Sequence, residues 1–164
     1  MQIRDRIKEL RRVKASELLP NPKNWRTHPV AQQDALRGVL AEVGYADALI
    51  ARETPEGLML VDGHLRAETT PDSDVPVLVL DIDEAEADLI LATLDPLAAM
   101  AEADTAQMRG LLDGIAETDG MADLFATLRQ EYAPTFEPVP LEIQSQLDQK
   151  NPTRCPECGH EWVA

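Results

Sequence analysis

The chain has 164 residues, of which 44% are hydrophobic and 27% charged, a composition typical of one globular domain with short extensions. No apolar run approaches the roughly 20 residues that cross a bilayer, and the charged N-terminus lacks the apolar core of a signal peptide. Both cysteines lie near the C-terminus, which gives no sign of a disulfide framework. We therefore expect a cytoplasmic protein.

The formal net charge of −15 is unevenly distributed. Residues 1–40 carry +5, residues 41–150 carry −19 and residues 151–164 carry −1. A body this acidic repels the phosphate backbone of DNA at long range. Any DNA binding is therefore expected to be weak and to depend on the basic first quarter. The basic side chains at its start are Arg4, Arg6, Lys8, Arg11, Arg12 and Lys14.

The spacing of apolar residues predicts the first elements. Residues 3–12 place apolar side chains at helical spacing among basic ones and predict a short N-terminal helix. A short strand and a loop rich in Pro and Asn are expected up to residue 29. Residues 32–43 predict an amphipathic helix that stops at Gly44.

The apolar pattern in the middle of the chain predicts three strands and one short helix. Residues 47–53 and 58–63 are short apolar runs joined by a Pro-Glu-Gly turn, which indicates a hairpin. Residues 64–70 have room for about two helical turns before Pro71. Residues 75–82 give the strongest signal for a buried strand.

Three further helices are expected before a linker. Asp83 and Asp104 are each followed three residues later by Glu or Gln, which is the capping-box pattern. A third helix is predicted by one apolar face, formed by Met121, Leu124, Phe125 and Leu128.

The stretch from Asp62 to Arg66 joins an apolar strand to a predicted helix. The first amides of a helix have no intrahelical partners and attract phosphate. Gly63 lets the backbone approach a ligand closely, and Arg66 offers a two-pronged contact to phosphate oxygens. The alternative is that Asp62 only caps the helix and Arg66 is solvated. Asp62 would also repel a phosphate unless a cation lies between them.

A second polar segment precedes the helix at 32–43. Asn24, Arg26 and His28 alternate, so an extended backbone would place all three side chains on one face. The alternative is a surface loop that Trp25 anchors in the core.

Together the two segments, "LLPNPKNWRTHP" and "DGHLR", resemble the ParB/sulfiredoxin-like family, also called the ParB-like nuclease domain. The resemblance covers about residues 11–95 and is closest to the N-terminal domains of phage and bacterial DNA methyltransferases, although no methyltransferase motif is present. It implies an α+β fold with a small mixed sheet, followed here by a helical extension and a Cys-x2-Cys tail. The predicted parts are an N-terminal helix (1–10), a ParB-like domain (11–95), a helical extension (96–132), a linker (133–154) and a zinc-knuckle-like tail (155–164).

The family also implies what the second box binds. In chromosome-segregation ParB proteins the box reads Gly-Glu-Arg-Arg and grips the triphosphate of CTP. Gly63 and Arg66 match it, whereas His64 and Leu65 replace the glutamate and the first arginine. In sulfiredoxin the box is Gly-Cys-His-Arg, and His64 takes the place of the nucleophilic cysteine, which excludes sulfinate reduction.

The leading hypothesis is a nucleotide- or phosphate-binding module in DNA metabolism, associated with DNA modification in a phage or mobile element. Its ligand would be a nucleoside triphosphate (CTP or ATP), with Mg²⁺ as a candidate companion. The predicted binding residues are Asn24, Arg26, His28, Gly63, His64 and Arg66. One alternative is a metal-dependent nuclease or phosphohydrolase that uses Asp62, His64 and Glu68. Another is a non-catalytic adaptor for a DNA methyltransferase.

The tail "CPECGHEW" has the Cys-x2-Cys spacing of half a zinc ribbon. Its candidate ligands are Cys155, Cys158 and His160, one fewer than a closed tetrahedral site needs. The tail is then a remnant of a longer zinc-binding segment, an exposed dithiol, or half of a zinc site that His28 or a second chain completes. A zinc-linked homodimer is the favoured form if metal binds.

Overall fold

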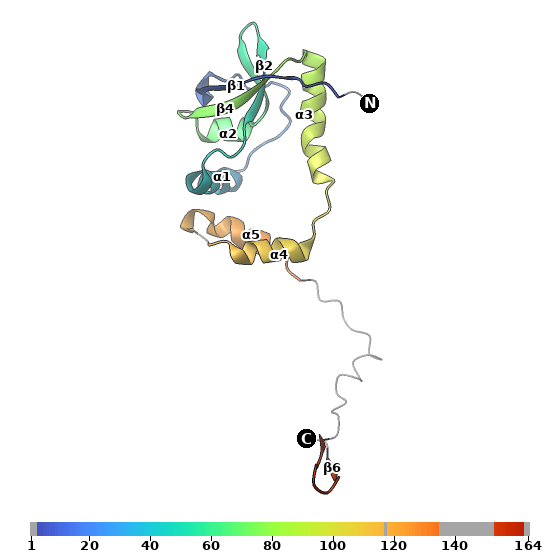
Figure 1. Ribbon diagram of the computed structural model, residues 1–164. Helices are drawn as coiled ribbons and strands as arrows, with labels where there is room; N and C mark the ends of the chain where they lie inside the picture. Colours follow the sequence, from blue (N-terminus) through green and yellow to red (C-terminus); the bar gives the residue numbers. More distant parts are fainter. Residues whose placement is uncertain (1–2, 117, 135–152, 163–164) are drawn as a thin grey trace. The chain divides into compact units, whose positions relative to one another are not determined.

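The computed structural model describes residues 3–116, 118–134 and 153–162 (Figure 1). It divides into two compact units, Met1–Ala133 and Pro134–Ala164. Most of the linker expected over residues 133–154 lies outside the described residues. No helix in the described ranges is long and apolar enough to cross a membrane.

A four-stranded mixed sheet forms the centre of the first unit. Its strands are β1 (Ile7–Lys14), β2 (Leu49–Thr54), β3 (Gly57–Asp62) and β4 (Asp74–Leu80). Their spatial order is β1-β4-β2-β3, with β2 parallel to β4 and the other two pairs antiparallel. The predicted hairpin and buried strand are confirmed, and so is the α+β class.

One face of the sheet forms the main core. Val75, Val77 and Val79 of β4 have no exposed surface, because alternate residues of a strand point to the same face. Leu49 and Leu60 of the neighbouring strands pack against them. Burying each of these side chains contributes about 1.5–3 kcal/mol, so this layer fixes the sheet on which the candidate site stands.

In the described part of the first unit, five helices and two short 3₁₀ segments accompany the sheet. They are η1 (Ala15–Glu17), α1 (Val30–Val43), α2 (His64–Thr69), α3 (Glu84–Ala99), α4 (Thr105–Gly114), η2 (Asp119–Met121) and α5 (Ala122–Glu131). In the described part of the second unit, β5 (Thr153–Arg154) pairs with β6 (Glu161–Trp162) in a small hairpin.

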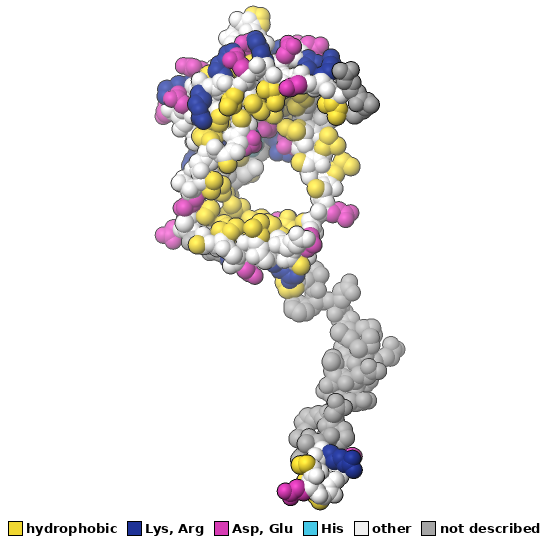
Figure 2. Space-filling model, in the orientation of Figure 1, with side chains coloured by type: hydrophobic (Ala, Val, Ile, Leu, Met, Phe, Trp, Pro, Cys, Tyr) yellow, Lys and Arg dark blue, Asp and Glu magenta, His cyan; other side chains and the backbone are white. Residues whose placement is uncertain are grey.

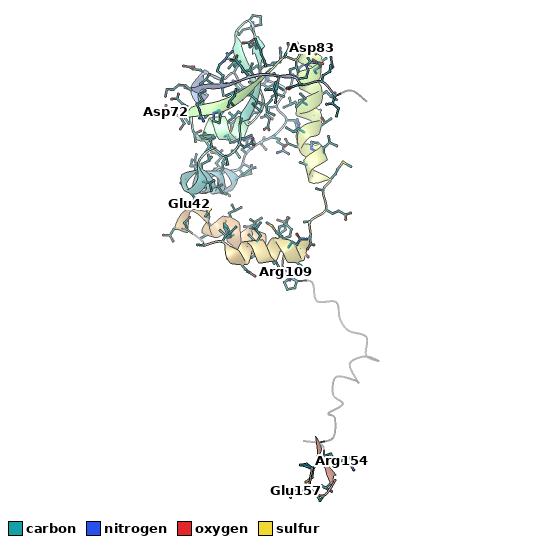
Figure 3. The ribbon with its side chains drawn as sticks, in the orientation of Figure 1. Glu42, Asp72, Asp83, Arg109, Arg154 and Glu157 are labelled. Atoms are coloured by element: carbon teal, nitrogen blue, oxygen red, sulfur yellow. The ribbon has the colours of Figure 1, made fainter. Side chains whose placement is uncertain are left out.

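The predicted helix ends are confirmed. Gly44 ends α1 at a φ of +77°, a left-handed conformation that favours glycine. Asp83, labelled in Figure 3 where α3 begins, accepts from the amide of Glu86, whose side chain accepts from the amide of Asp83 in return. Asp104 caps α4 by accepting from the amide of Gln107.

A second, smaller core joins α4 and α5 to α1. Leu112, Met121 and Phe125 are buried in it, which confirms the apolar face predicted for the last helix. Gly38 of α1 lies against Gly120, since a Cβ on Gly38 would lie 2.2 Å from the Gly120 carbonyl oxygen. The helical extension is therefore packed on the ParB-like part through α1.

The N-terminal helix predicted over residues 3–12 is wrong, because Ile7–Lys14 forms strand β1. β1 pairs antiparallel with β4 along its length, and Arg6 binds Glu86 of α3 through both guanidinium Nη atoms, at 2.7 and 2.6 Å. A helix this short is marginal alone, whereas the strand gains ladder hydrogen bonds on a preformed edge. The domain boundary placed at residue 95 falls inside α3, which continues through Pro96.

Candidate functional site

A cavity of about 200 Å³ lies in the first unit between the segment before α1, the start of α2, and α3. Its lining includes all six residues predicted from the sequence to bind phosphate: Asn24, Arg26, His28, Gly63, His64 and Arg66. Asp62 also lines it. The fold thus brings the two sequence boxes to one cavity.

Gly63 makes the turn from β3 into α2 possible. Its φ of +92° is left-handed, and a Cβ there would lie 2.6 Å from Cγ of Leu49 in the core. Both the backbone and the packing therefore require glycine. α2 has no side-chain cap, so the predicted alternative in which Asp62 caps this helix is wrong.

Arg66 lies between two carboxylates. Its Nη1 is 2.7 Å from Oδ2 of Asp47, and its Nη2 is 2.9 Å from Oδ2 of Asp62. The side chain of Arg66 is only 17% exposed, so it is not the solvated side chain of the alternative interpretation. Its hydrogen bond holds the pKa of Asp47 below the ordinary value.

Arg26 faces the cavity from the other wall. Its Nε is 2.7 Å from Oδ2 of Asp95 on α3, and its guanidinium lies 5.2 Å from the centroid of the Trp25 ring. Trp25 is 56% exposed, so it does not anchor the loop in the core. Asn24 accepts from the amide of Arg26 and fixes the backbone there.

Besides the Arg26–Asp95 pair, three contacts fasten the segment before α1 to α3. Lys23 lies between Glu84 and Asp88, with Nζ–O distances of 2.8 and 2.6 Å. Two residues on, the indole of Trp25 donates to the carbonyl of Leu91 at 3.2 Å. The wall that carries Arg26 is therefore held by the helix rather than left as a free loop.

The two histidines of the cavity have different surroundings. His64 is buried, its Nε2 accepts from the amide of Asn21, and burial lowers its pKa. His28 bonds Gln32 through Nδ1 at 3.3 Å, while its buried Nε2 has no partner among the described residues. His64 is thus a buried side chain with a hydrogen bond at Nε2, whereas Nε2 of His28 has no hydrogen-bond partner in the described part of the chain.

The three residues of the nuclease alternative are not gathered around one cavity. Asp62 lines the cavity described above, whereas Glu68 lines a separate hollow with Ala15 and Leu18. Only His64 borders both. In the described ranges no group of three or more His, Cys, Asp or Glu side chains could bind a metal.

Sequence reasoning missed Asp47 and Asp95, the carboxylates that pair with the two arginines. Asp47 lies just before β2, and Asp95 lies on α3. Neither belongs to a recognisable motif, and no sequence signal links either one to its arginine. The tail candidates lie in the second unit, where the amide of Cys155 donates to the carbonyl of His160.

No family model and no curated protein sequence matches the chain. Among solved structures, it is similar to the C-terminally truncated chromosome-partitioning protein ParB of Caulobacter crescentus in complex with CTP-γ-S. The sequence identity is 19% and the TM-score 0.57, over 85% of this chain and 84% of that chain. The fold is that of ParB.

Two further ParB structures match with TM-scores below 0.5. ParB of Caulobacter crescentus bound to the centromeric parS site has 18% identity and a TM-score of 0.45, over 84% of this chain and 76% of that chain. A Pnob8-like ParB-N domain has 15% identity and a TM-score of 0.43, over 96% and 59%. The similarity to the first of these structures, with its TM-score of 0.57, confirms the resemblance inferred from the two sequence boxes as a ParB-like fold.

Proposed function

We propose that this ParB-like chain binds the phosphates of a nucleoside triphosphate, CTP or ATP, in the cavity between Arg26 and Arg66. The observation that carries the proposal is the meeting of two arginines and the unpartnered Nε2 of His28 at one cavity. Guanidinium groups bind phosphate oxygens in pairs. The complex of the Caulobacter ParB with CTP-γ-S supports a nucleotide as the ligand.

The carboxylates set a condition on binding. Arg66 and Arg26 are already paired with Asp47, Asp62 and Asp95, and the cavity volume of about 200 Å³ is below the roughly 300 Å³ of small ligand sites. A triphosphate therefore has to replace a carboxylate on at least one arginine. Mg²⁺ entering with the nucleotide would compensate the released carboxylate, since hard cations prefer oxygen ligands. Asp62, on the cavity wall, is the residue we assign to this role.

The biological setting we propose is DNA metabolism, in association with DNA modification in a phage or mobile element. The sequence boxes support this setting, because they are closest to those of domains that precede DNA methyltransferases. A partner methyltransferase would then act on DNA while this chain binds the nucleotide.

The test is a thermal-shift screen of the full chain with CTP, ATP, GTP and UTP, each with and without Mg²⁺. A nucleotide at 100 times its Kd should stabilise the fold by about 2.7 kcal/mol, a rise in Tm of roughly 5–10 °C. The shift should be larger with Mg²⁺ than without it. If no nucleotide shifts Tm at millimolar concentration, the proposal is wrong.

A non-catalytic adaptor for a methyltransferase is the second candidate, favoured by apolar side chains on the surface. Figure 2 shows them in yellow along α3 and along the α4–α5 pair. Leu89 and Leu97 of α3, Met100 just after α3, and Leu111 of α4 are each at least 60% exposed. Exposed apolar groups of this kind mark protein interfaces. Failure of the nucleotide screen, with retention of a methyltransferase on the immobilised chain, would favour this candidate.

A further inference from the structure

Trp25 is an exposed aromatic side chain on the wall of the candidate cavity. It lines the cavity, yet it is 56% exposed, whereas tryptophan is highly buried on average. Its orientation is nevertheless fixed. The indole Nε1 donates to the carbonyl of Leu91 on α3 at 3.2 Å, and the guanidinium of Arg26 lies 5.2 Å from the ring centroid. The indole is therefore a preorganised aromatic surface that a ligand can reach.

A second hollow adjoins the first at this aromatic surface. It has a volume of about 350 Å³ and is lined by Trp25, Arg26, Thr27, His28 and Gln32. All of these residues except Thr27 also line the first cavity, so the two hollows share a wall. The first cavity is smaller than a site for a whole nucleotide, whereas the second exceeds the roughly 300 Å³ of small ligand sites. A ligand with its phosphates in the first cavity can therefore extend into the second.

We propose that the second hollow holds the nucleobase of the bound nucleotide, stacked on the Trp25–Arg26 pair. The inference rests on the proposed function and extends it from the phosphates to the base. Bases stack on aromatic rings and on guanidinium planes, and here the guanidinium lies over the ring. Arg26 can serve both hollows, because a guanidinium hydrogen-bonds through its edge and stacks through its face. The bond from the indole to Leu91 leaves the ring little rotational freedom to lose on stacking.

The polar side chains of the second hollow do not select one base. The hydroxyl of Thr27 both donates and accepts, so it suits any base edge. Oε1 of Gln32 lies 3.3 Å from Nδ1 of His28, which leaves the NH₂ group of Gln32 for a ligand. Every base carries an acceptor for such a donor, and every base has a π-face for stacking. The four nucleoside triphosphates are therefore expected to bind with similar affinity.

The experiment is isothermal titration of the full chain with CTP, ATP, GTP, UTP and inorganic triphosphate, each with Mg²⁺. The four nucleotides should bind within about tenfold of one another, and inorganic triphosphate should bind more weakly, because it lacks the stacked base. Trp25→Ala should weaken the binding of every nucleotide by about 5- to 150-fold, the range for one stacked base. The same variant should bind inorganic triphosphate as the wild-type chain does. Trp25→Phe should keep part of the nucleotide affinity, since phenylalanine retains an aromatic face.

Tryptophan fluorescence gives a second readout, because the chain has two tryptophans, Trp25 and Trp162. The control variant Trp162→Phe changes a residue of the second unit and leaves Trp25 as the sole indole. In this variant each nucleotide should quench the emission of Trp25 with the Kd found by titration. Inorganic triphosphate should leave the emission nearly unchanged, because it places no ring against the indole.

Three outcomes would overturn the inference while leaving the phosphate site in place. They are equal affinities of the wild-type chain for nucleotides and inorganic triphosphate, nucleotide binding that Trp25→Ala leaves unchanged or weakens no more than it weakens triphosphate binding, and a preference for one base above about tenfold. Failure of all five ligands to bind the wild-type chain would instead contradict the proposed function, and the inference with it. The Tm of each variant without ligand provides the folding control.

Discussion

Basic side chains meet carboxylates in two regions of the first unit, with different consequences. Around the cavity, Arg66 and Arg26 come from separate elements and converge on one hollow. Along β1, which is an edge strand, Lys8 and Arg11 pair with Glu53 of β2. Both regions contain arginine–carboxylate pairs, but among the described residues only the first combines them with the limited exposure of Arg66 and a histidine nitrogen that has no partner.

The difference shows why counting basic residues does not locate a phosphate site. An exposed ion pair contributes about 0–1 kcal/mol and offers a ligand little, since water already solvates both partners. A pair in a partly buried hollow interacts more strongly with an incoming anion because the local dielectric constant is lower. The cavity is therefore the expected nucleotide site, and β1 is expected to bind polyanions weakly.

The largest expected effect comes from breaking the frame of the cavity at Gly63. Gly63→Ala should lower the free energy of unfolding by roughly 2–5 kcal/mol, because alanine disfavours the left-handed backbone and its Cβ would overlap Leu49. Chemical denaturation measures this loss. The matched control is Gly110→Ala in α4, where a Cβ meets no atom within 4 Å, and it should stabilise the protein by about 0.5–1 kcal/mol. Equal effects of the two substitutions would contradict the packing role of Gly63.

The second effect tests Arg66 as a ligand-binding group. Arg66→Ala should remove the stabilisation by nucleotide, since each charge-assisted hydrogen bond to phosphate contributes about 1.5–3 kcal/mol. Stability without nucleotide should also fall, because Arg66 is only 17% exposed and its pair with Asp62 is partly buried, so binding is compared at a temperature at which both forms are folded. Isothermal titration of both forms provides the measurement. The control is Arg37→Ala, which removes an exposed ion pair with Asp34 on α1. If Arg66→Ala binds nucleotide as tightly as this control does, Arg66 is not part of the binding site.

Local patterns in the sequence predicted the helix caps, the hairpin and the glycine turn, because each depends on residues a few positions apart. Asp83 with Glu86 and Gly63 before α2 are examples. The lining of the cavity was also predictable, since the two boxes carry the family resemblance.

The remaining features depend on contacts between distant parts of the chain. Ile7–Lys14 has helical apolar spacing, yet the open edge of β4 makes it a strand. The partners Asp47 and Asp95 approach their arginines only in the folded structure. The same holds for the burial of His64, whose position after Gly63 suggested a reactive side chain. Tertiary packing overrode local preference in each case.

The third effect tests the contrast between the two histidines through pH. Burial lowers the folded pKa of His64 below its ordinary value of 6.5, so the unfolded chain binds the proton more readily. Stability should therefore be complete above pH 6.5 and decline as pH falls below it, by at most about 1.4 kcal/mol per pH unit for one proton. His64→Asn should flatten this slope in denaturation curves between pH 7 and pH 5. An unchanged slope would mean that another group titrates, and His28→Asn serves as the comparison.

The smallest effect concerns DNA and the basic edge β1. Arg12 is exposed and has no ion pair in the described part of the chain, whereas Lys8 and Arg11 both pair with Glu53 and Arg11 also pairs with Glu9. Few charges thus remain to release counterions from DNA, and the charge of −19 over residues 41–150 opposes approach. We expect the chain alone to bind duplex DNA with a Kd of about 1–100 µM and no sequence preference.

Arg12→Ala should weaken this binding further and reduce the slope of log K against log salt by about 1, the value for one lost phosphate contact. Fluorescence anisotropy from 50 to 200 mM salt measures both quantities. Arg26→Ala is the matched control, because Arg26 is paired with Asp95 at the cavity and should not change DNA affinity. Nanomolar, sequence-specific binding at physiological salt would reverse the comparison, since β1 would then be the principal phosphate-binding region of the chain.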